Sequence, residues 1–390
     1  MTSFYKTEYL EQELSNAGFE DIINSPFMQR LKGVSFLSTI DYIYDLNHRF
    51  SRYDHSLGVA YIALILARNL ELSDFQSKVL VIANMLHDVG HSPFSHAAET
   101  FLLEKKNKYH ESILKSYIRY NTRLFPDAPG LKDLLSTRAD NLKMAVFCLL
   151  QNRDSNDSIL QSLFDCSINC DKIDGTNRTL YSLGLDYYNP LNLINCFKRN
   201  NNKIYIKRDC GKSIYDFWLL KKNVYENYIY TMDVMSSEAM LTRSLEIALD
   251  NENSLISFLS GTDDEIINII MDDDRAKRII IKFINRNYYK PVSISFPLIF
   301  NKFKGRIISA RFDKIKREAI EKKIANIINT EPIYTITHFS FRKDFKNNPG
   351  LLHQLNIFDD NNDMIPIDSL NKAFYTERLS GEFFDIFIEN

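Results

Sequence analysis

The sequence lacks the features of a membrane-spanning or secreted protein. It contains no run of about 18 apolar residues, so it predicts no helix that crosses a membrane. The first segment, MTSFYKTEYLEQEL, carries acidic side chains and no apolar stretch, so we expect no secretory signal. Cysteine is scarce and odd in number, five in 390 residues, which fits a reducing compartment such as the cytoplasm. Cys166 and Cys170 match no zinc-ribbon spacing and are interpreted as core residues.

The chain also has almost no net charge. Its 48 Lys and Arg residues nearly balance its 50 Asp and Glu residues, which leaves a formal charge of −2. Such a balance gives no general attraction to nucleic acid, so a nucleic-acid partner is not indicated. A length of 390 residues exceeds the roughly 250–300 at which single cores tend to split, so we expect one large domain and one smaller domain.

Histidine, by contrast, is concentrated in one part of the chain. Five of the eight histidines lie in one stretch near the N-terminal end: His55, His87, His91, His96 and His110. Imidazole is the usual side chain for binding a metal or moving a proton near neutral pH. A lone His-Asp pair at a helix end is usually a solvated capping group, but random scatter would rarely crowd five histidines. The crowding therefore predicts a chemical site.

Helix signals around this stretch suggest how the side chains converge. An apolar helix ends at His87 and is followed by Gly90, which suits a left-handed helix end. Ser92-Pro93 then suits the start of the next helix. On that helix His96 and Glu99 would be three residues apart and would share a face.

Periodicity outlines the rest of the fold. Capping boxes, SDFQ at 73–76 and TDDE at 262–265, mark two helix starts. Apolar spacing predicts continuous helices over 158–183 and 214–248, and KIYIK at 203–207 alternates like a strand. Toward the C-terminus apolar and polar residues alternate, which is the pattern of β-strands and predicts a small sheet. The sequence therefore predicts a mainly α protein with a smaller C-terminal α+β part.

A metal site can be assembled from this order of residues. A metal with imidazole and carboxylate ligands needs donors from several segments, because adjacent residues fill only part of a coordination shell. His55 begins an apolar helix, His87 and Asp88 end the next one, and Asp171 lies on a later helix. These four residues supply two nitrogens and two carboxylates. Such a set suits a divalent ion, namely Mn, Fe, Zn or Ni and, less well, Mg.

The same order resembles the HD-domain phosphohydrolases and, within them, the deoxynucleoside triphosphate triphosphohydrolases, which include the bacterial dGTPases and the vertebrate sterile-alpha-motif/HD protein. The resemblance implies an HD-type helical bundle as catalytic domain over residues 1–280. It further implies a C-terminal α+β region over 281–390 for oligomerisation or regulation. The matching segments are FMQRLKGV (27–34), RYDHSLGV (52–59), HDVGHSPFSH (87–96), YHES (109–112) and DKIDGTNR (171–178).

Two basic residues are candidates for binding the substrate's phosphates. Arg52 lies three residues before His55, and its fork of N–H groups suits phosphate oxygens. Lys221 stands where the family has an arginine that holds the triphosphate, and it would act as a point charge. The structural alternatives are a salt bridge from Arg52 to Asp54 or Glu99, and a solvated basic helix face for Lys221.

The remaining candidates would move protons. Hydrolysis of a phosphate ester releases an alkoxide, a poor leaving group that needs a proton. His96, oriented by Glu99, is the expected donor, and the resemblance implies such a pair. His91 and His110 would contact phosphate or relay protons, and each has a structural role as its alternative.

The implied reaction is hydrolysis of deoxynucleoside triphosphates to deoxynucleoside and triphosphate, by a dimer or tetramer with a nucleotide activator. The chain departs from the family at its sugar and regulatory contacts. No DPIHG segment precedes FMQRL, Phe36 stands where some members have glutamine, and Gly175 replaces a tyrosine. Two alternatives therefore stay open. One is another HD phosphohydrolase acting on nucleoside monophosphates, cyclic nucleotides or alarmones, and the other is a non-catalytic nucleotide sensor.

Overall fold

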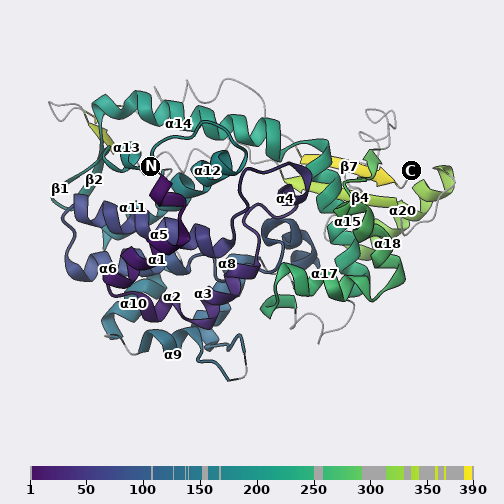
Figure 1. The fold of residues 1–390 in the computed structure, drawn as a ribbon, viewed down its shortest axis with the longest axis horizontal. Helices are drawn as coiled ribbons and strands as arrows, with labels where there is room; N and C mark the ends of the chain where they lie inside the picture. Colours follow the sequence, from purple (N-terminus) through teal and green to yellow (C-terminus); the bar gives the residue numbers. More distant parts are fainter. Residues whose placement is uncertain are drawn as a thin grey trace.

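The computed structural model confirms a mainly α protein. One central helix, α5 (Arg52–Asn69), organises the larger part of it (Figure 1). Its sequence is apolar on almost every side, so it is buried around most of its circumference. The structure describes residues 2–106, 109–125, 127–136, 138, 140–151, 157–166, 168–249, 258–291, 313–328, 335–341, 356–358, 364–365 and 382–388.

Helices from distant parts of the chain pack around α5. Its neighbours are α1 (Thr7–Asn16), α6 (Asp74–Leu86) and α12 (Cys170–Ser182) (Figure 1). Both α5 and α6 begin with a capping box, as the segment SDFQ predicted for α6. The other helices of this part are 3-10 helix η1 (Thr2–Tyr5), α2 (Glu20–Ile23), α3 (Pro26–Arg30), 3-10 helix η2 (Leu31–Gly33), α4 (Ile40–Ile43), 3-10 helix η3 (Ser95–Ala98), α7 (Glu99–Lys106), α8 (His110–Tyr120), α9 (Leu131–Ser136), α10 (Asp140–Leu150), α11 (Ser158–Asp165) and α13 (Pro190–Ile194).

Two small sheets accompany the helices that follow. The first has the order β1-β2-β5-β6, in which the predicted strand at 203–207 pairs antiparallel with its neighbour and parallel with a C-terminal strand. The second has the order β3-β7-β4 and lies beside α15 and α20 (Figure 1). The elements are β1 (Phe197–Asn200), β2 (Lys203–Lys207), 3-10 helix η4 (Arg208–Cys210), α14 (Gly211–Val224), π-helix η5 (Tyr225–Ile229), α15 (Met232–Ala248), α17 (Asp263–Met271), α18 (Asp274–Ile284), β3 (Lys290–Pro291), α20 (Lys314–Ile328), β4 (Thr335–Phe341), β5 (Asn356–Phe358), β6 (Met364–Ile365) and β7 (Glu382–Ile388).

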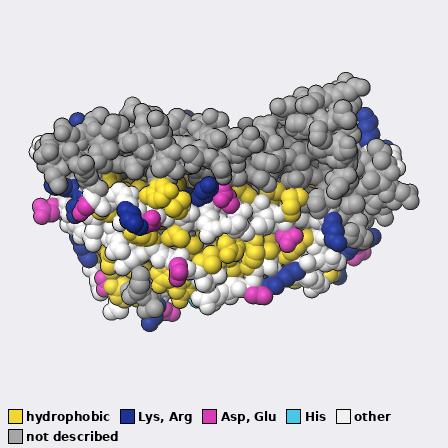
Figure 2. Space-filling model, turned by 90° about the horizontal axis from the view of Figure 1, so that it is seen from above, with side chains coloured by type: hydrophobic (Ala, Val, Ile, Leu, Met, Phe, Trp, Pro, Cys, Tyr) yellow, Lys and Arg dark blue, Asp and Glu magenta, His cyan; other side chains and the backbone are white. Residues whose placement is uncertain are grey.

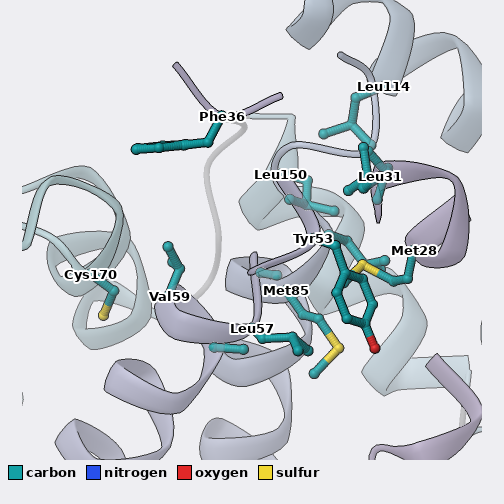
Figure 3. Close-up of a cluster of buried hydrophobic side chains, with 14 of the residues drawn as sticks. Met28, Leu31, Phe36, Tyr53, Leu57, Val59, Met85, Leu114, Leu150 and Cys170 are labelled. Atoms are coloured by element: carbon teal, nitrogen blue, oxygen red, sulfur yellow. The ribbon is translucent and has the colours of Figure 1, made fainter. Parts of the chain in front are cut away.

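The apolar core fills the space between the helices that carry the histidines. Figure 3 shows side chains of α5, such as Tyr53 and Leu57, beside Met85 of α6 and Met28 of α3. All four are at most 1% exposed. Close packing of this kind holds the ends of α5 and α6 in fixed relative positions. The core therefore determines where the polar residues at those ends lie.

Buried ion pairs attach α20 to α15. Arg243 of α15 donates to Glu321 of α20 over 2.7 Å, and Arg317 of α20 donates to Glu246 over 2.5 Å. All four side chains are nearly inaccessible, and each buried charge has a partner of opposite sign.

The division of the chain into two domains at residue 280 stays a proposal. This boundary falls inside α18.

Three sequence-based predictions of helix extent were wrong. The continuous helix predicted over 158–183 is two helices, because the side chain of Asn169 caps a new start at α12 by accepting from the backbone N–H of Lys172. The helix predicted over 214–248 is likewise interrupted by η5 and by the N-cap residue Thr231. The helix expected to start at Ser92-Pro93 begins only with η3.

The surface of the described residues is mixed in character. Seen from above, hydrophobic, basic and acidic side chains are interspersed on the described part of this face (Figure 2). No helix among the described residues is both long and apolar enough to cross a bilayer.

Cys166 and Cys170 are buried free thiols, as predicted, whereas Cys196 and Cys210 form a disulfide that the sequence did not lead us to expect.

The close approach of α5 to α12 requires a glycine. A methyl group on Gly58 would overlap the carboxylate of Asp174 and the guanidinium of Arg178, which form a buried pair. We expect Gly58→Ala to lower the free energy of unfolding by about 1–3 kcal/mol, as overpacking does. Gly211→Ala is the control, because a methyl group there meets nothing within 4 Å. Denaturant unfolding of both variants measures the difference, and equal midpoints would contradict this account.

Candidate metal centre

The four predicted metal ligands meet at the ends of three helices. His55 lies in the first turn of α5, His87 is the C-cap of α6 with Asp88 directly after it, and Asp171 lies in the first turn of α12. His55 and Asp88 are almost fully buried, whereas the side chain of Asp171 is 45% exposed. The group is therefore anchored in the core and open on the side of α12.

The distances between these donors fit a common ion. Asp171 Oδ1 lies 3.2 Å from His55 Nε2 and 3.7 Å from His87 Nε2. Asp88 Oδ1 lies 3.1 Å from His87 Nε2, and its other oxygen, Oδ2, lies 3.6 Å from His55 Nε2, so Asp88 borders the three other donors without belonging to their mutually close group. Neighbouring ligands that share an ion at about 2.1 Å are separated by roughly 3 Å or slightly more. His55, His87 and Asp171 also form one of two residue groups whose donor atoms all lie within 4.8 Å of one another.

The hydrogen bonds of the two histidines leave the correct nitrogen for a metal. His87 Nδ1 lies 2.7 Å from the carbonyl oxygen of Asn84, so it must carry the proton and donate. Its Nε2 is buried and makes no hydrogen bond to any described residue. His55 Nδ1 lies 2.7 Å from Asp174, which fixes Nε2 as the unprotonated nitrogen in the same way. In its neutral form each histidine therefore keeps Nε2 for a metal, and the donor set fits a divalent ion.

The charges of the group are strongly coupled. Burial opposes protonation of His87, but the neighbouring carboxylates of Asp88 and Asp171 outweigh it and raise its pKa to about 9. Burial disfavours charge on Asp88 too, yet the charges of His87 and Arg52 hold the pKa of that carboxyl well below its usual range. The site thus favours two ionised carboxylates that attract positive charge.

A second group of side chains adjoins the first. Glu99 places one carboxylate oxygen 3.2 Å from His96 Nδ1 and the other in a hydrogen bond with His110 Nδ1. His91 is 1% exposed, stacks on the ring of His110 at 4.0 Å, and lies 3.4 Å from Asp88 Oδ1. The structure thus brings all four predicted proton-handling residues together, beside the metal ligands.

These four residues also form the other group of potential metal donors. The rings of His91 and His110 are nearly parallel, with an interplanar angle of 12°. Lone pairs lie in the plane of each ring, so those of stacked rings run side by side rather than toward one point. Hydrogen bonds from His110 and His96 hold the pKa of Glu99 well below its usual range, although burial opposes this. The group is therefore better suited to moving a proton than to holding an ion.

The loop between the two groups is fixed by residues that the sequence analysis missed. Arg30 donates to the backbone carbonyls of Val89 and His91, and Asp263 accepts from the N–H of Phe94 over 2.7 Å. We had predicted a left-handed conformation for Gly90, but the backbone of this residue does not have a positive φ. A side chain there would overlap the backbone of α8, which explains the glycine by close approach.

The two candidate phosphate ligands have different surroundings. Arg52 is buried and donates to Asp88 over 2.7 Å and to Ser95 over 2.9 Å, rather than to the alternative partners proposed from sequence. Its charge is thus held beside the metal centre. Lys221 is 8% exposed, and its ammonium lies 5.2 Å from the ring centroid of Trp218. A buried amine of this kind is not part of a solvated basic face.

Asp174 is a positioning residue that sequence reasoning did not assign. Its carboxylate lies 2.7 Å from His55 Nδ1. It also accepts two hydrogen bonds from the guanidinium of Arg178, over 2.8 and 2.9 Å. Losing such a partner typically costs about 10–100-fold in metal affinity. We expect Asp174→Asn to weaken metal binding by this amount, measured by competition with a chelating dye on protein whose helicity is unchanged. Arg178→Gln, which keeps the carboxylate on His55, should weaken it less, and the reverse order would contradict the assignment.

Comparison with known proteins finds one matching family model and several distant relatives. Residues 52–145 match the HD domain family. The chain is 25% identical over 236 residues to the uncharacterized protein YwfO of Bacillus subtilis, covering 58% of this chain and 51% of that protein. It is 23% identical over 375 residues to deoxynucleoside triphosphate triphosphohydrolase SAMHD1 of Bos taurus, covering 80% and 63%. This chain thus spans about half the length of several curated relatives, among them an uncharacterized protein of Mycoplasma pneumoniae at 50%.

The fold is also similar to that of a solved structure. A phosphohydrolase from Bacteroides thetaiotaomicron superposes with a TM-score of 0.71, is 16% identical, and covers 95% of each chain. At this identity the likeness concerns the fold alone. Residues 52–145 thus match the HD domain, and the grouping of histidines and aspartates described above can hold a divalent metal ion as a cofactor.

Proposed function

We propose that the protein hydrolyses deoxynucleoside triphosphates to deoxynucleoside and triphosphate. The observation that carries the proposal is the adjacency of the two groups, joined by the 3.4 Å approach of His91 to Asp88. Cleavage of a phosphate ester at neutral pH needs an electrophile at the phosphorus and a proton for the leaving oxygen. Residues suited to each task lie side by side here. The similarity to a triphosphohydrolase from Bos taurus supports the choice of substrate.

The roles divide between the groups. His55, His87, Asp88 and Asp171 would hold the divalent ion. When bound, such an ion supplies Lewis acidity and lowers the pKa of water.

The other side chains act on the substrate. Arg52 and Lys221 would hold the β- and γ-phosphates, while the ion and His96 would flank the α-phosphate. His96 would protonate the departing 5′-oxygen, with Glu99 orienting its ring and with His91 and His110 contacting phosphate or relaying protons.

Isotope placement tests this assignment of the bond that breaks. Water attacks the α-phosphorus, the bond to the 5′-oxygen breaks, and that oxygen leaves with a proton. Hydrolysis of a dNTP in ¹⁸O-labelled water should therefore give unlabelled nucleoside and labelled tripolyphosphate. Chromatography separates the two products, and mass spectrometry shows which of them contains ¹⁸O. Inorganic phosphate with a diphosphate would exclude the mechanism.

A second candidate rests on the wall beside His55. The ring of Phe36 lies 4.7 Å from the ring of His55, and Gly175 faces the same region without a side chain. Neither residue can donate a hydrogen bond from a side chain to a sugar. This favours another HD phosphohydrolase, acting on nucleoside monophosphates, cyclic nucleotides or alarmones. A panel of these substrates beside dNTPs would distinguish the two, and binding without turnover would identify a non-catalytic nucleotide sensor.

The remaining expectations are proposals on the same basis. A homo-oligomer, dimer or tetramer, with a nucleotide activator is inferred from the resemblance alone, as is the role of residues 281–390 in oligomerisation or regulation. Manganese is the metal we would test first. A cytoplasmic location is inferred from the small, odd number of cysteines, and the disulfide between Cys196 and Cys210 argues against it. Light scattering with and without nucleotide tests the oligomer, and a monomeric mass under both conditions would contradict it.

A further inference from the structure

A glycine lies in the middle of α12, where alanine would suit the helix better. Glycine within a helix is unfavourable relative to alanine, because its backbone loses more freedom on folding. Gly175 does not have a positive φ. A methyl group there would lie 3.6 Å from His55 Cε1, 3.8 Å from Phe36 Cζ and 3.9 Å from Asp171 Oδ1, all ordinary van der Waals contacts. In contrast to Gly58, neither backbone conformation nor close packing requires this glycine.

The space that a side chain of residue 175 would fill borders the candidate metal centre. His55 Cε1 lies between the two nitrogens of its ring, one of which is Nε2, the nitrogen that the neutral ring keeps for a metal. Asp171 lies one helical turn before Gly175, so the two residues share a face of α12. Both are partly exposed, whereas Asp174 and Thr176 beside Gly175 are at most 7% exposed. Helix α12 thus presents a proposed ligand and, one turn later, bare backbone to the same open space.

Phe36 borders this space and is held in place by its neighbours. Its ring lies 4.7 Å from the ring of His55, and 5.2 Å separate its centroid from the guanidinium carbon of Arg52. Phe36 carries no hydrogen-bonding group on its side chain, and Gly175 has no side chain, so this part of the lining is apolar. Such a surface suits the carbon face of a ring rather than a charged phosphate, whose oxygens would face the ion and Arg52.

The proposed reaction places a ring of this kind close to the metal centre. The ion and His96 would flank the α-phosphate, and the sugar of the nucleotide is joined to that phosphate only through one oxygen and the 5′-carbon. The sugar must therefore lie within a few ångströms of the ion. A surface without a side chain, next to His55 and Asp171, offers the room that the sugar needs.

We propose that Gly175 is a specificity-determining residue, which leaves room for the sugar of a nucleotide to pack its carbon face on Gly175 and Phe36. The inference rests on the proposed hydrolysis of nucleotides. It adds that shape, rather than hydrogen bonding, selects the sugar on this side of the site. The glycine is then kept at a cost in helix stability, because alanine would occupy the space of the ligand.

Equilibrium dialysis of two ligands, with Mn²⁺ present, tests the proposal on the full chain. One ligand is a radiolabelled dATP analogue in which a methylene group replaces the 5′-oxygen, so the bond proposed to break is absent and no turnover is needed. The other is inorganic tripolyphosphate, which has no sugar. Gly175→Ala should weaken binding of the nucleotide analogue roughly tenfold or more, the usual effect of one added carbon in a pocket. Binding of tripolyphosphate should not change.

The same substitution should make the protein more stable. Alanine is the better helix residue and fits here without overlap, so the midpoint of denaturant unfolding should rise in Gly175→Ala. A purely structural glycine would not combine a gain in stability with a loss of nucleotide binding. Gly211→Ala is the matched control, since a methyl group there meets nothing within 4 Å and the residue, the first of α14, is not part of the site. It should bind both ligands as the unmodified protein does.

Three outcomes for Gly175→Ala would overturn the proposal. Unchanged binding of the nucleotide analogue would show that the space is not used by the sugar. Equal losses for both ligands would show that the residue acts through the ion or the phosphates. A lowered unfolding midpoint would show that packing requires the glycine. An unmodified protein that binds neither ligand would instead overturn the proposed function, and this inference with it.

Discussion

Asp171→Ala should abolish stable metal binding and reduce hydrolysis further than any change outside the ligand set. The carboxylate of Asp171 lies within 3.7 Å of both histidine Nε2 atoms, so its loss removes a proposed direct ligand. Losing only a hydrogen-bond partner of a ligand already costs about 10–100-fold, and we expect a direct ligand to cost more. Metal content measured by mass spectrometry after gel filtration, together with turnover, gives the result.

Asp171 is a better choice than Asp88 for this experiment. Asp88 is buried and neutralises Arg52, so its removal would leave an unpaired charge in the core. Asp171 is 45% exposed, and the fold should survive its loss. Asp140→Ala is the control, since that residue is an exposed aspartate in the first turn of another helix, α10. Full metal content in Asp171→Ala would remove this residue from the ligand set.

The candidate site could be predicted because metal binding and proton transfer require particular residue types, which are visible in the sequence. Five of the eight histidines crowd into one stretch, and their order with the aspartates along the chain was visible. Arg30 and Asp263 could not be found in the same way. They act on the histidine loop across 61 and 169 positions of sequence, through backbone groups that carry no signature of their own. Such contacts follow from tertiary packing and not from local pattern.

The fold shows the same contrast. Strand β2 and the starts of α6 and α17 were predicted at the correct residues, because alternation and capping boxes are local signals. The break between α11 and α12 was missed although Asn169, a favoured N-cap residue, marks it. The parallel pairing of β2 with β5 joins residues about 150 positions apart, as in the pair Tyr205 and Asn356, and no local pattern predicts it.

His96→Ala should lower turnover by roughly 10²–10⁴-fold, the range for a lost general acid. The side chain of His96 is 58% exposed, so it can reach a substrate, and its Nδ1 lies 3.2 Å from Glu99 Oε2. Because Glu99 holds Nδ1, Nε2 is the nitrogen that is left to act as the proton donor. Metal content should stay unchanged, because His96 belongs to the neighbouring group and not to the ligand set. His48→Ala is the control, since this histidine is exposed and packs on Phe50 outside the site.

The acid role can be separated from a structural one by the leaving group. A substrate whose leaving group is a nitrophenolate needs little protonation, so its hydrolysis should fall much less in His96→Ala than that of a dNTP. Glu99→Gln should show the same selectivity with a smaller loss, because it weakens the orientation of His96 and also frees His110. Equal losses for both substrates would assign His96 to substrate binding. Near-normal turnover of dNTP would move the acid role to His110 or to water, since His110 shares the same carboxylate.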